Sequence, residues 1–277
     1  MSKDLSRRSV LTGAGYAAAG TLASMLPGEL FGAQPAAPAT RPAPGGARPA
    51  AAPAPIKDIV LTMLYPSGPD LKFDADAFRD RHIAVLQKAY VALERIELRV
   101  PPATAEGAPP PPMLAAVSMW ISDFNKFAAG ASANAKDVAA SINTITNSRP
   151  MAQLDRFVAG LGAERASVTA NSRCLSHFFE AKADAKWDAK VYADSYLRKL
   201  MAALGPEAAQ RIEVLKGEQA TDGTKPLMLG SVNIYYTDAD KFFNAMETES
   251  VKVVAAEEAG FYTTPPIQTL FMVHSIG

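Results

Sequence analysis

The chain has 277 residues, of which 48% are apolar and 20% are charged, a balance typical of a soluble protein with a sizeable core. Lys plus Arg and Asp plus Glu both number 28, which argues against a nucleic-acid-binding protein, since such proteins need clustered positive charge. The single cysteine, Cys174, excludes an intrachain disulfide, so the fold must be held by its core.

Residues 1–33 have the layout of an export signal. The pair Arg7 and Arg8 precedes a mildly apolar run at residues 13–25, and this order resembles the twin-arginine signal of bacteria. The run is too short for a membrane span, which needs roughly 20 apolar residues. We therefore expect the chain to engage the twin-arginine export machinery and to reach the periplasm, without a stable membrane span. The alternative is a short amphipathic helix with a chance arginine pair.

Residues 34–55 consist almost wholly of Ala, Pro, Gly and Arg. Such a composition buries little apolar surface, so it predicts a disordered or polyproline-like linker. The twin-arginine route carries folded proteins that are often loaded with a cofactor, so this kind of export is a hint of a cofactor.

A repeat runs through the rest of the chain. The segment Ser122–Phe127 recurs as Thr237–Phe242, an offset of 115 residues, and Arg95–Glu97 recurs as Arg211–Glu213, an offset of 116. Further matches pair Phe73 with Trp187, Phe78 with Tyr192, Pro150 with Pro265, and Gln153 with Gln268. Matches in one order at nearly one offset indicate two similar units, residues 56–160 and 171–277, joined by a short linker.

The first unit predicts six elements in chain order. Alternating side chains predict a strand at 59–65, which Pro66 and Pro69 end. Asp74 is a favourable N-cap for a helix whose apolar stripe runs over residues 75–89. The remaining elements are a strand at 96–100, a strand at 114–121 after a Pro-rich loop, a helix capped by Asp123, and a strand at 154–158.

The order strand, helix, strand, strand, helix, strand is that of the ferredoxin-like βαββαβ unit, an α+β fold with two helices on one face of a four-stranded sheet. One such sheet leaves its other face bare. We expect the two units to pack sheet to sheet, so that one chain forms a closed barrel. The alternative of two independent domains is disfavoured by the short linker at residues 161–170.

The first unit resembles the EthD family. The resemblance rests on Met63–Pro66, Phe73–Asp74, Phe78–His82, Lys136–Val138, Asn147, Pro150 and Gln153. It implies the dimeric α+β barrel superfamily, whose members include small monooxygenases, cyclases, isomerases and haem-dependent enzymes, and it implies a part in ether degradation or a similar oxidative pathway. The second unit looks like a diverged copy, with Tyr196 in place of His82, so the family's site exists at most once.

His82 and Tyr65 are the candidate catalytic residues. His82 lies on the apolar stripe of the first helix, which turns it toward the sheet, and a histidine there can act as an acid or base near neutral pH. Tyr65 ends the first strand and can present its hydroxyl to the same cavity. The alternative for His82 is a core residue that hydrogen-bonds to a backbone carbonyl. The alternative for Tyr65 is an ordinary strand residue whose hydroxyl contacts solvent.

Arg79, Arg81 and Tyr196 are the candidate substrate-binding residues. The two arginines flank the helix stripe, where they either bind a substrate carboxylate or are simply solvated. Tyr196 places an amphipathic ring at the position equivalent to His82.

We expect no metal site, because the three histidines, His82, His177 and His274, are not at ligand spacing and no cysteine pair exists. Haem is not excluded, since one histidine can suffice as its axial ligand, and the cofactor is otherwise unknown. Cys174 is expected to be an inert packed thiol.

Three functional hypotheses follow. The first is an exported enzyme, an oxidoreductase, cyclase or isomerase of a degradation pathway, that acts on a small apolar organic molecule with His82 as its acid or base. The second is a non-catalytic protein that binds such a ligand or supports a partner enzyme. The third is a haem-binding barrel.

Overall fold

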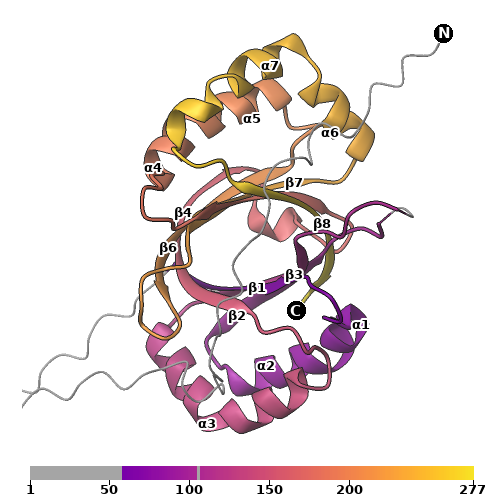
Figure 1. Cartoon of the computed structure of the whole chain (residues 1–277), viewed down its shortest axis with the longest axis vertical. Helices are drawn as coiled ribbons and strands as arrows, with labels where there is room; N and C mark the ends of the chain where they lie inside the picture. Colours follow the sequence, from indigo (N-terminus) through magenta and orange to yellow (C-terminus); the bar gives the residue numbers. More distant parts are fainter. Residues whose placement is uncertain (1–57, 105–106) are drawn as a thin grey trace, which may run out of the picture.

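The computed structural model describes residues 58–104 and 107–277. The predicted signal peptide (1–33) and linker (34–55) lie outside these residues. Within the described ranges, eight strands form one closed antiparallel barrel in the order β1-β3-β2-β8-β5-β7-β6-β4 (Figure 1). The strands are β1 (Ile59–Pro66), β2 (Leu93–Val100), β3 (Met113–Ile121), β4 (Met151–Gly162), β5 (Arg173–Glu180), β6 (Arg211–Ala220), β7 (Met228–Tyr236) and β8 (Ile267–Ile276).

Each half of the chain supplies four adjacent strands in a matching order. The first four strands are arranged 4-1-3-2, and the last four are arranged 8-5-7-6. Two seams join the halves, because β2 pairs with β8 and β4 pairs with β6. Both edges of each half are thereby hydrogen-bonded to the other half, so the described barrel has no open sheet edge. The predicted α+β fold and closed barrel are confirmed.

Helices cover the outside of the barrel on two opposite sides, one side for each half of the chain (Figure 1). The first half supplies α1 (Ala75–Ala77), η2 (Phe78–His82), α2 (Ile83–Ala89) and α3 (Phe124–Ile142). The short η3 (Arg165–Ser167) follows β4, and the second half supplies α4 (Ala189–Val191), η4 (Tyr192–Leu197), α5 (Arg198–Leu204), α6 (Ala239–Met246), α7 (Glu249–Ala255) and η5 (Glu258–Phe261). In the described part of the chain, no helix is long and apolar enough to cross a membrane.

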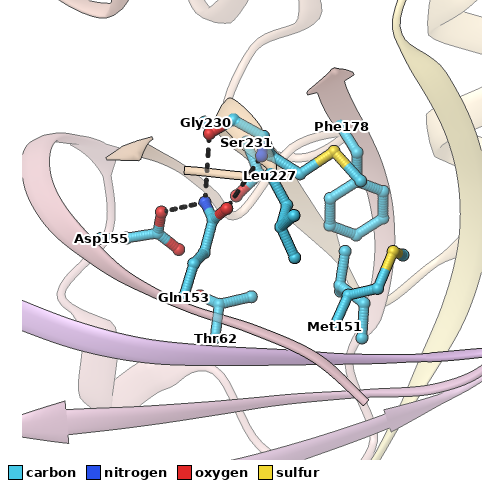
Figure 2. Close-up of a pocket in the computed structure, with 10 residues that line it drawn as sticks. Thr62, Met151, Gln153, Asp155, Phe178, Leu227, Gly230 and Ser231 are labelled. Atoms are coloured by element: carbon cyan, nitrogen blue, oxygen red, sulfur yellow. Dashed lines mark hydrogen bonds between the residues drawn. The ribbon is translucent and has the colours of Figure 1, made fainter. Parts of the chain in front are cut away.

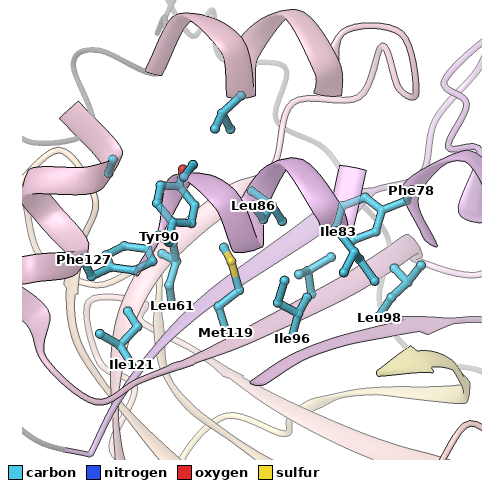
Figure 3. Close-up of a cluster of buried hydrophobic side chains, with 14 of the residues drawn as sticks. Leu61, Phe78, Ile83, Leu86, Tyr90, Ile96, Leu98, Met119, Ile121 and Phe127 are labelled. Atoms are coloured by element: carbon cyan, nitrogen blue, oxygen red, sulfur yellow. The ribbon is translucent and has the colours of Figure 1, made fainter. Parts of the chain in front are cut away.

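Alternating side chains along the strands separate an outer core from the barrel interior. In β1, Leu61 packs under the helices of the first half, whereas Val60 and Leu64 belong to clusters inside the barrel. Figure 3 shows the outer core of the first half, where Leu86 and Phe127 come from the helices. The interior is therefore formed by side chains that point away from both helix layers.

The predicted N-caps are present. The Asp74 carboxylate accepts a hydrogen bond from the backbone N–H of Ala77 at 2.9 Å, and Asp123 accepts from the N–H groups of Asn125 and Lys126. These bonds satisfy backbone donors that a helix start leaves unpaired.

The first helix of each half contains a π-helical segment that the apolar spacing did not predict. In the first half, the N–H of Ile83 bonds to the carbonyl of Phe78, five residues earlier. The second half has the same feature at Tyr192–Leu197. The two helices are thus irregular at corresponding places.

Two further differences concern β4. It extends beyond the predicted 154–158 at both ends, because Gln153–Gly162 pairs with β6 of the other half. Strand register also corrects one match of the repeat: Thr62 pairs with Gln153, and at the corresponding place in the second half Ser176 pairs with Thr269. Gln153 therefore corresponds to Thr269 and not to Gln268.

Candidate active site at one mouth of the barrel

Polar side chains fill the middle of the barrel. Arg99 of β2 is buried and donates hydrogen bonds to Ser118 of β3, Ser176 of β5 and Asn233 of β7. One guanidinium thus links strands of both halves across the interior. Because this layer is packed and shielded from solvent, a ligand site must lie toward one of the two ends.

The repeated Arg-Ile-Glu motif forms a second polar layer. Glu97 accepts a hydrogen bond from the Tyr235 hydroxyl at 2.7 Å and pairs with Arg95 at 3.2 Å. Glu213 pairs with both Arg211 and Arg165, each at 2.7 Å. The motif lies on strands, as predicted, and the structure adds that both glutamates face the interior and are held by arginines.

A pocket opens at the end of the barrel where β1 ends and where β4 and β7 begin (Figure 2). Its volume is about 270 Å³ including the open mouth. The apolar part of its wall consists of Leu64, Met151, Phe178, Leu227 and Met228, and the rest consists of Thr62, Gln153, Asp155, Gly230 and Ser231. An apolar pocket with a few convergent polar groups at a barrel mouth is typical of a small-molecule site.

Gln153 is held in the pocket wall by three hydrogen bonds. Its side-chain oxygen accepts from the N–H of Met228 at 2.8 Å, and its side-chain nitrogen donates to the Met228 carbonyl at 3.3 Å and to the Asp155 carboxylate at 2.6 Å (Figure 2). Both ends of the amide are therefore fixed by β7. The anchored Gln153 in turn fixes the orientation of Asp155.

Gly230 is required at the rim of this pocket. Its φ is 157°, and a Cβ at this position would lie 2.1 Å from the backbone oxygen of Leu215. The absence of a side chain lets β7 pass close to β6 here. A larger residue would displace the strand that anchors Gln153.

Asp155 has the properties of an acid/base group. Burial raises its pKa to about 6, although the hydrogen bond from Gln153 acts to lower it. The residue is only 1% exposed. A carboxyl group whose pKa lies near working pH can accept and release a proton with little penalty, which general acid/base catalysis requires.

The structure places His82 outside the barrel, under the helices of the first half. Its Nδ1 lies 2.9 Å from the Ser141 hydroxyl on α3, and its ring packs edge-on against Phe78 at 5.0 Å. Burial lowers its pKa to about 4, so the ring is neutral near pH 7. His82 does not line the pocket at the barrel mouth. Its hydrogen-bond partner is a side-chain hydroxyl instead of the backbone carbonyl considered above.

Tyr65 lies in the same outer core as the ring of Phe78. Its ring is 4.7 Å from that of Phe73, which is 5.6 Å from that of Phe78. Burial raises the pKa of the Tyr65 hydroxyl above its ordinary value. Tyr65 and His82 are therefore connected through two phenylalanines and not by direct contact.

The two candidate arginines lie on the solvent side of the same helix. Arg79 is paired with Asp76 at 2.9 Å and with Asp80 at 2.6 Å, and its Nη1 lies 3.4 Å from His274. Arg81 is exposed. Neither arginine lines the pocket at the barrel mouth.

Tyr196 lies in the outer core of the second half, on the opposite side of the barrel from His82. Its ring is 4.9 Å from Tyr192 and 5.7 Å from Phe261. Beside it is a polar cluster that sequence reasoning missed: Glu258 accepts a hydrogen bond from the Tyr192 hydroxyl at 2.7 Å, and His177 Nδ1 lies 3.4 Å from the same carboxylate.

Among the described residues, no histidine lines the barrel-mouth pocket, so this pocket offers no histidine ligand to a haem. His177 is buried on the outer face of β5, with its Nδ1 3.4 Å from Glu258. No group of three or more His, Cys, Asp or Glu that could hold a metal ion occurs among residues 58–104 and 107–277. Cys174 is buried, and burial raises its pKa to about 11.

The sequence held one signal for Asp155. It follows Gln153 by two residues in a strand, so both side chains face the same side, and a carboxylate on a buried face is uncommon unless it is paired. The missing information was which face of β4 would become the barrel interior.

No family model and no curated protein matches the sequence. A proposed monooxygenase from Fusobacterium nucleatum has a similar structure, with 10% identity, a TM-score of 0.52, and coverage of 79% of this chain and 93% of that chain. An anthrone oxidase-like protein has 10% identity, a TM-score of 0.50, and coverage of 79% and 92%. An EthD-like protein from Ralstonia eutropha has 19% identity, a TM-score of 0.31, and coverage of 36% and 88%. The likeness is one of fold: an α+β structure with a closed eight-stranded antiparallel barrel, which resembles the dimeric α+β barrel proteins and is built here by one chain.

Proposed function

We propose that the protein binds a small, largely apolar organic molecule in the barrel-mouth pocket and transforms it by proton transfer to Asp155. The observation that carries the proposal is a buried carboxyl group with a pKa raised to about 6 in the wall of a mostly apolar pocket. The names of two structural neighbours, a proposed monooxygenase and an anthrone oxidase-like protein, support oxidation as the overall reaction.

The pocket residues take separate parts in this reaction. Leu64 and Phe178 contact the apolar body of the ligand and exclude water, Gln153 orients the carboxylate, and Ser231 offers a hydroxyl to a polar atom of the ligand. Above about pH 6, the Asp155 carboxylate accepts a proton from an acidic C–H or O–H group. The ligand keeps the electron pair as a carbanion, which adds to molecular oxygen as the oxidant. The peroxide takes back the proton from Asp155 and loses water, so that one oxygen atom ends in a new C=O group and the other in water.

Ligand entry requires movement at the rim. In its present form, the pocket has room for about one water molecule. Leu227, at its edge, is 44% exposed. Rotation of this side chain is the simplest way to admit an organic ligand, because the strands around it are fixed by the barrel.

Binding can be measured at the methionine methyl groups. Met151 and Met228 both line the pocket, whereas Met272 is exposed on β8. In a carbon-13 NMR titration with anthrone, the compound class named for one neighbour, the signals of Met151 and Met228 should move and that of Met272 should not. Unchanged signals at the two pocket methionines would show that the pocket does not bind this class of ligand.

The catalytic role is tested by Asp155→Asn. Oxidation of anthrone, followed as oxygen uptake, should fall at least about 100-fold, because an amide cannot accept the proton. The wild-type rate should itself decline as the pH is lowered through about 6. Asp137→Asn, at an exposed position on α3, and His82→Gln should keep the activity. If His82→Gln lost activity while Asp155→Asn kept full activity, the proposal would be wrong and the active site would lie at His82 and Tyr65.

We further infer that each half is a ferredoxin-like unit, that the chain is a tandem EthD-like pair, and that it is exported through its twin-arginine signal. The matching strand orders of the halves support the first inference, and the EthD-like motifs of residues 63–153 support the second. The arginine pair, apolar run and linker within residues 1–55 support export to the periplasm.

A further inference from the structure

A second cavity lies at the opposite end of the barrel from the Asp155 pocket. It contains about 620 Å³ including its open mouth, and it is bounded by the start of β1, the end of β3 and η3. The side chains that matter here are Asp58, Glu94, Trp120, Ser122, Phe157 and Arg165. Along β1, this cavity lies at residues 58–59 and the Asp155 pocket at residues 62–64, with the buried Val60 between them.

Arg165 forms one wall of this cavity. Its guanidinium carbon lies 4.9 Å from the ring centroid of Trp120 and 4.6 Å from that of Phe157, so the group is held between two aromatic rings. Its Nε donates to Glu213 at 2.7 Å. The guanidinium is therefore fixed in position, while its side chain remains 27% exposed.

Hydrogen-bond donors beside this cavity lack acceptors. In the described structure, only Nε of Arg165 donates to a protein acceptor, and the side chain with its two terminal nitrogens remains partly exposed to solvent. Trp120 is 4% exposed, and its indole N–H has no acceptor. A buried donor without a partner next to a cavity indicates an absent water or ligand. The planar fork of an arginine matches a carboxylate in particular.

The charge balance also favours an anion. The interior layer at this end contains three arginines, Arg95, Arg165 and Arg211, against two glutamates, Glu97 and Glu213, a difference of 3 − 2 = +1. The acidic residues of the cavity, Asp58 and Glu94, lie at its exposed rim. These two carboxylates repel an anion only weakly, because the surrounding water has a high dielectric constant. The excess of arginines attracts the anion from the buried side of the cavity, where charges interact more strongly.

We propose that this cavity binds a small organic carboxylate with a planar apolar body. The carboxylate accepts hydrogen bonds from the terminal nitrogens of Arg165, next to the buried Trp120, and the body lies against the partly buried Phe157. This site is separate from the Asp155 pocket, so a test of carboxylate binding here is independent of the proton-transfer chemistry proposed there.

The test uses the indole N–H signals of the full chain. The sequence has two tryptophans, and Trp187 is stacked on Phe179 at 4.3 Å in the outer core of the second half, so it serves as the internal control. Nitrogen-15 NMR with benzoate as the probe should shift the Trp120 signal saturably, with a dissociation constant of about 1 mM, and leave Trp187 unchanged. Benzamide, which has the same shape without the charge, should bind at least about tenfold more weakly.

Matched variants locate the binding group. Arg165→Lys keeps the charge but loses the fork, and it should weaken benzoate binding about tenfold. Arg156→Lys, an exposed arginine paired with Glu218 on the neighbouring strand, should bind as the wild type does. Glu94→Gln should strengthen binding about twofold by removing a repulsive charge. The proposal is overturned if about 10 mM benzoate leaves Trp120 unchanged, or if benzamide binds as tightly as benzoate. That comparison needs only the wild-type protein.

Discussion

Asp155 and His82 are both buried titratable residues, and burial moves their pKa values in opposite directions. The pKa of Asp155 rises from 3.8 to about 6, so the folded protein holds this proton more tightly than the unfolded chain does. The pKa of His82 falls from 6.5 to about 4, so the folded protein holds this proton less tightly. Between about pH 4 and 6, Asp155 therefore lowers stability as pH rises and His82 raises it.

When one of these residues is replaced, the pH dependence of the free energy of unfolding should reflect the other residue alone. Asp155→Asn should increase the free energy of unfolding near pH 7 by up to about 3 kcal/mol, because about two pKa units at 1.4 kcal/mol each are no longer lost on burial. Stability of this variant should then decrease steadily from about pH 6.5 to 4 through His82. Urea unfolding across this range measures both effects. A variant that is less stable than the wild type near pH 7 would contradict the raised pKa.

The first helix of each half combines a well-capped start with an irregular middle. In the second half, Asp188 accepts hydrogen bonds from the N–H groups of Lys190 and Val191, both at 2.9 Å, directly before the π-helical segment Tyr192–Leu197. Because a π turn interrupts the regular ladder, the short α4 depends on its cap to hold Tyr192 over the sheet.

Asp188→Ala should lower the free energy of unfolding by about 1 kcal/mol, the usual value of an aspartate cap. Guanidinium denaturation of the full chain measures it. Asp184→Ala, four residues earlier on an exposed turn, is the matched control and should change stability by less than about 0.5 kcal/mol. Equal stabilities of the two variants would show that the helix start is held by packing alone.

The barrel as a whole is joined at its two seams and across its middle. The seams are the β2–β8 and β4–β6 ladders, and the cross-connection is Arg99, which reaches from β2 to Ser176 and Asn233 of the second half. Arg99 also lies 3.4 Å from Glu97. Its removal leaves several buried polar groups unpaired at the same time.

Arg99→Ala should therefore lower the free energy of unfolding by at least about 3 kcal/mol. Both halves should unfold in a single transition, since the seams make them one cooperative unit, and circular dichroism and tryptophan fluorescence should report the same midpoint. The exposed Arg81→Ala is the control, with an expected change of less than about 0.5 kcal/mol. Two separated transitions in the wild type would indicate independent halves.

Local patterns in the sequence predicted the elements well. The alternation of residues 59–65 and the caps Asp74 and Asp123 are signals carried by neighbouring residues. The barrel-mouth site depends instead on which strands meet. Gln153 is held by Met228, which lies 75 residues away, and Asp155 is buried because β4 pairs with β6 of the other half. His82 was predicted to be catalytic because it lies on the apolar stripe of the first helix. In the structure, its ring faces the Ser141 hydroxyl on α3.

Because one chain builds the whole barrel, the two halves can differ where a symmetric dimer of identical subunits could not. By strand register, Asp155 faces Val60 and its counterpart Phe271 faces Cys174. At the place equivalent to Asp155, the ring of Phe271 packs 6.3 Å from that of Phe178. In the same way, Arg99 corresponds to Leu215, and Trp120 to Tyr235. The two halves of this barrel therefore differ in their interior residues, and Asp155 and Arg165 each line a cavity at one end of the barrel only.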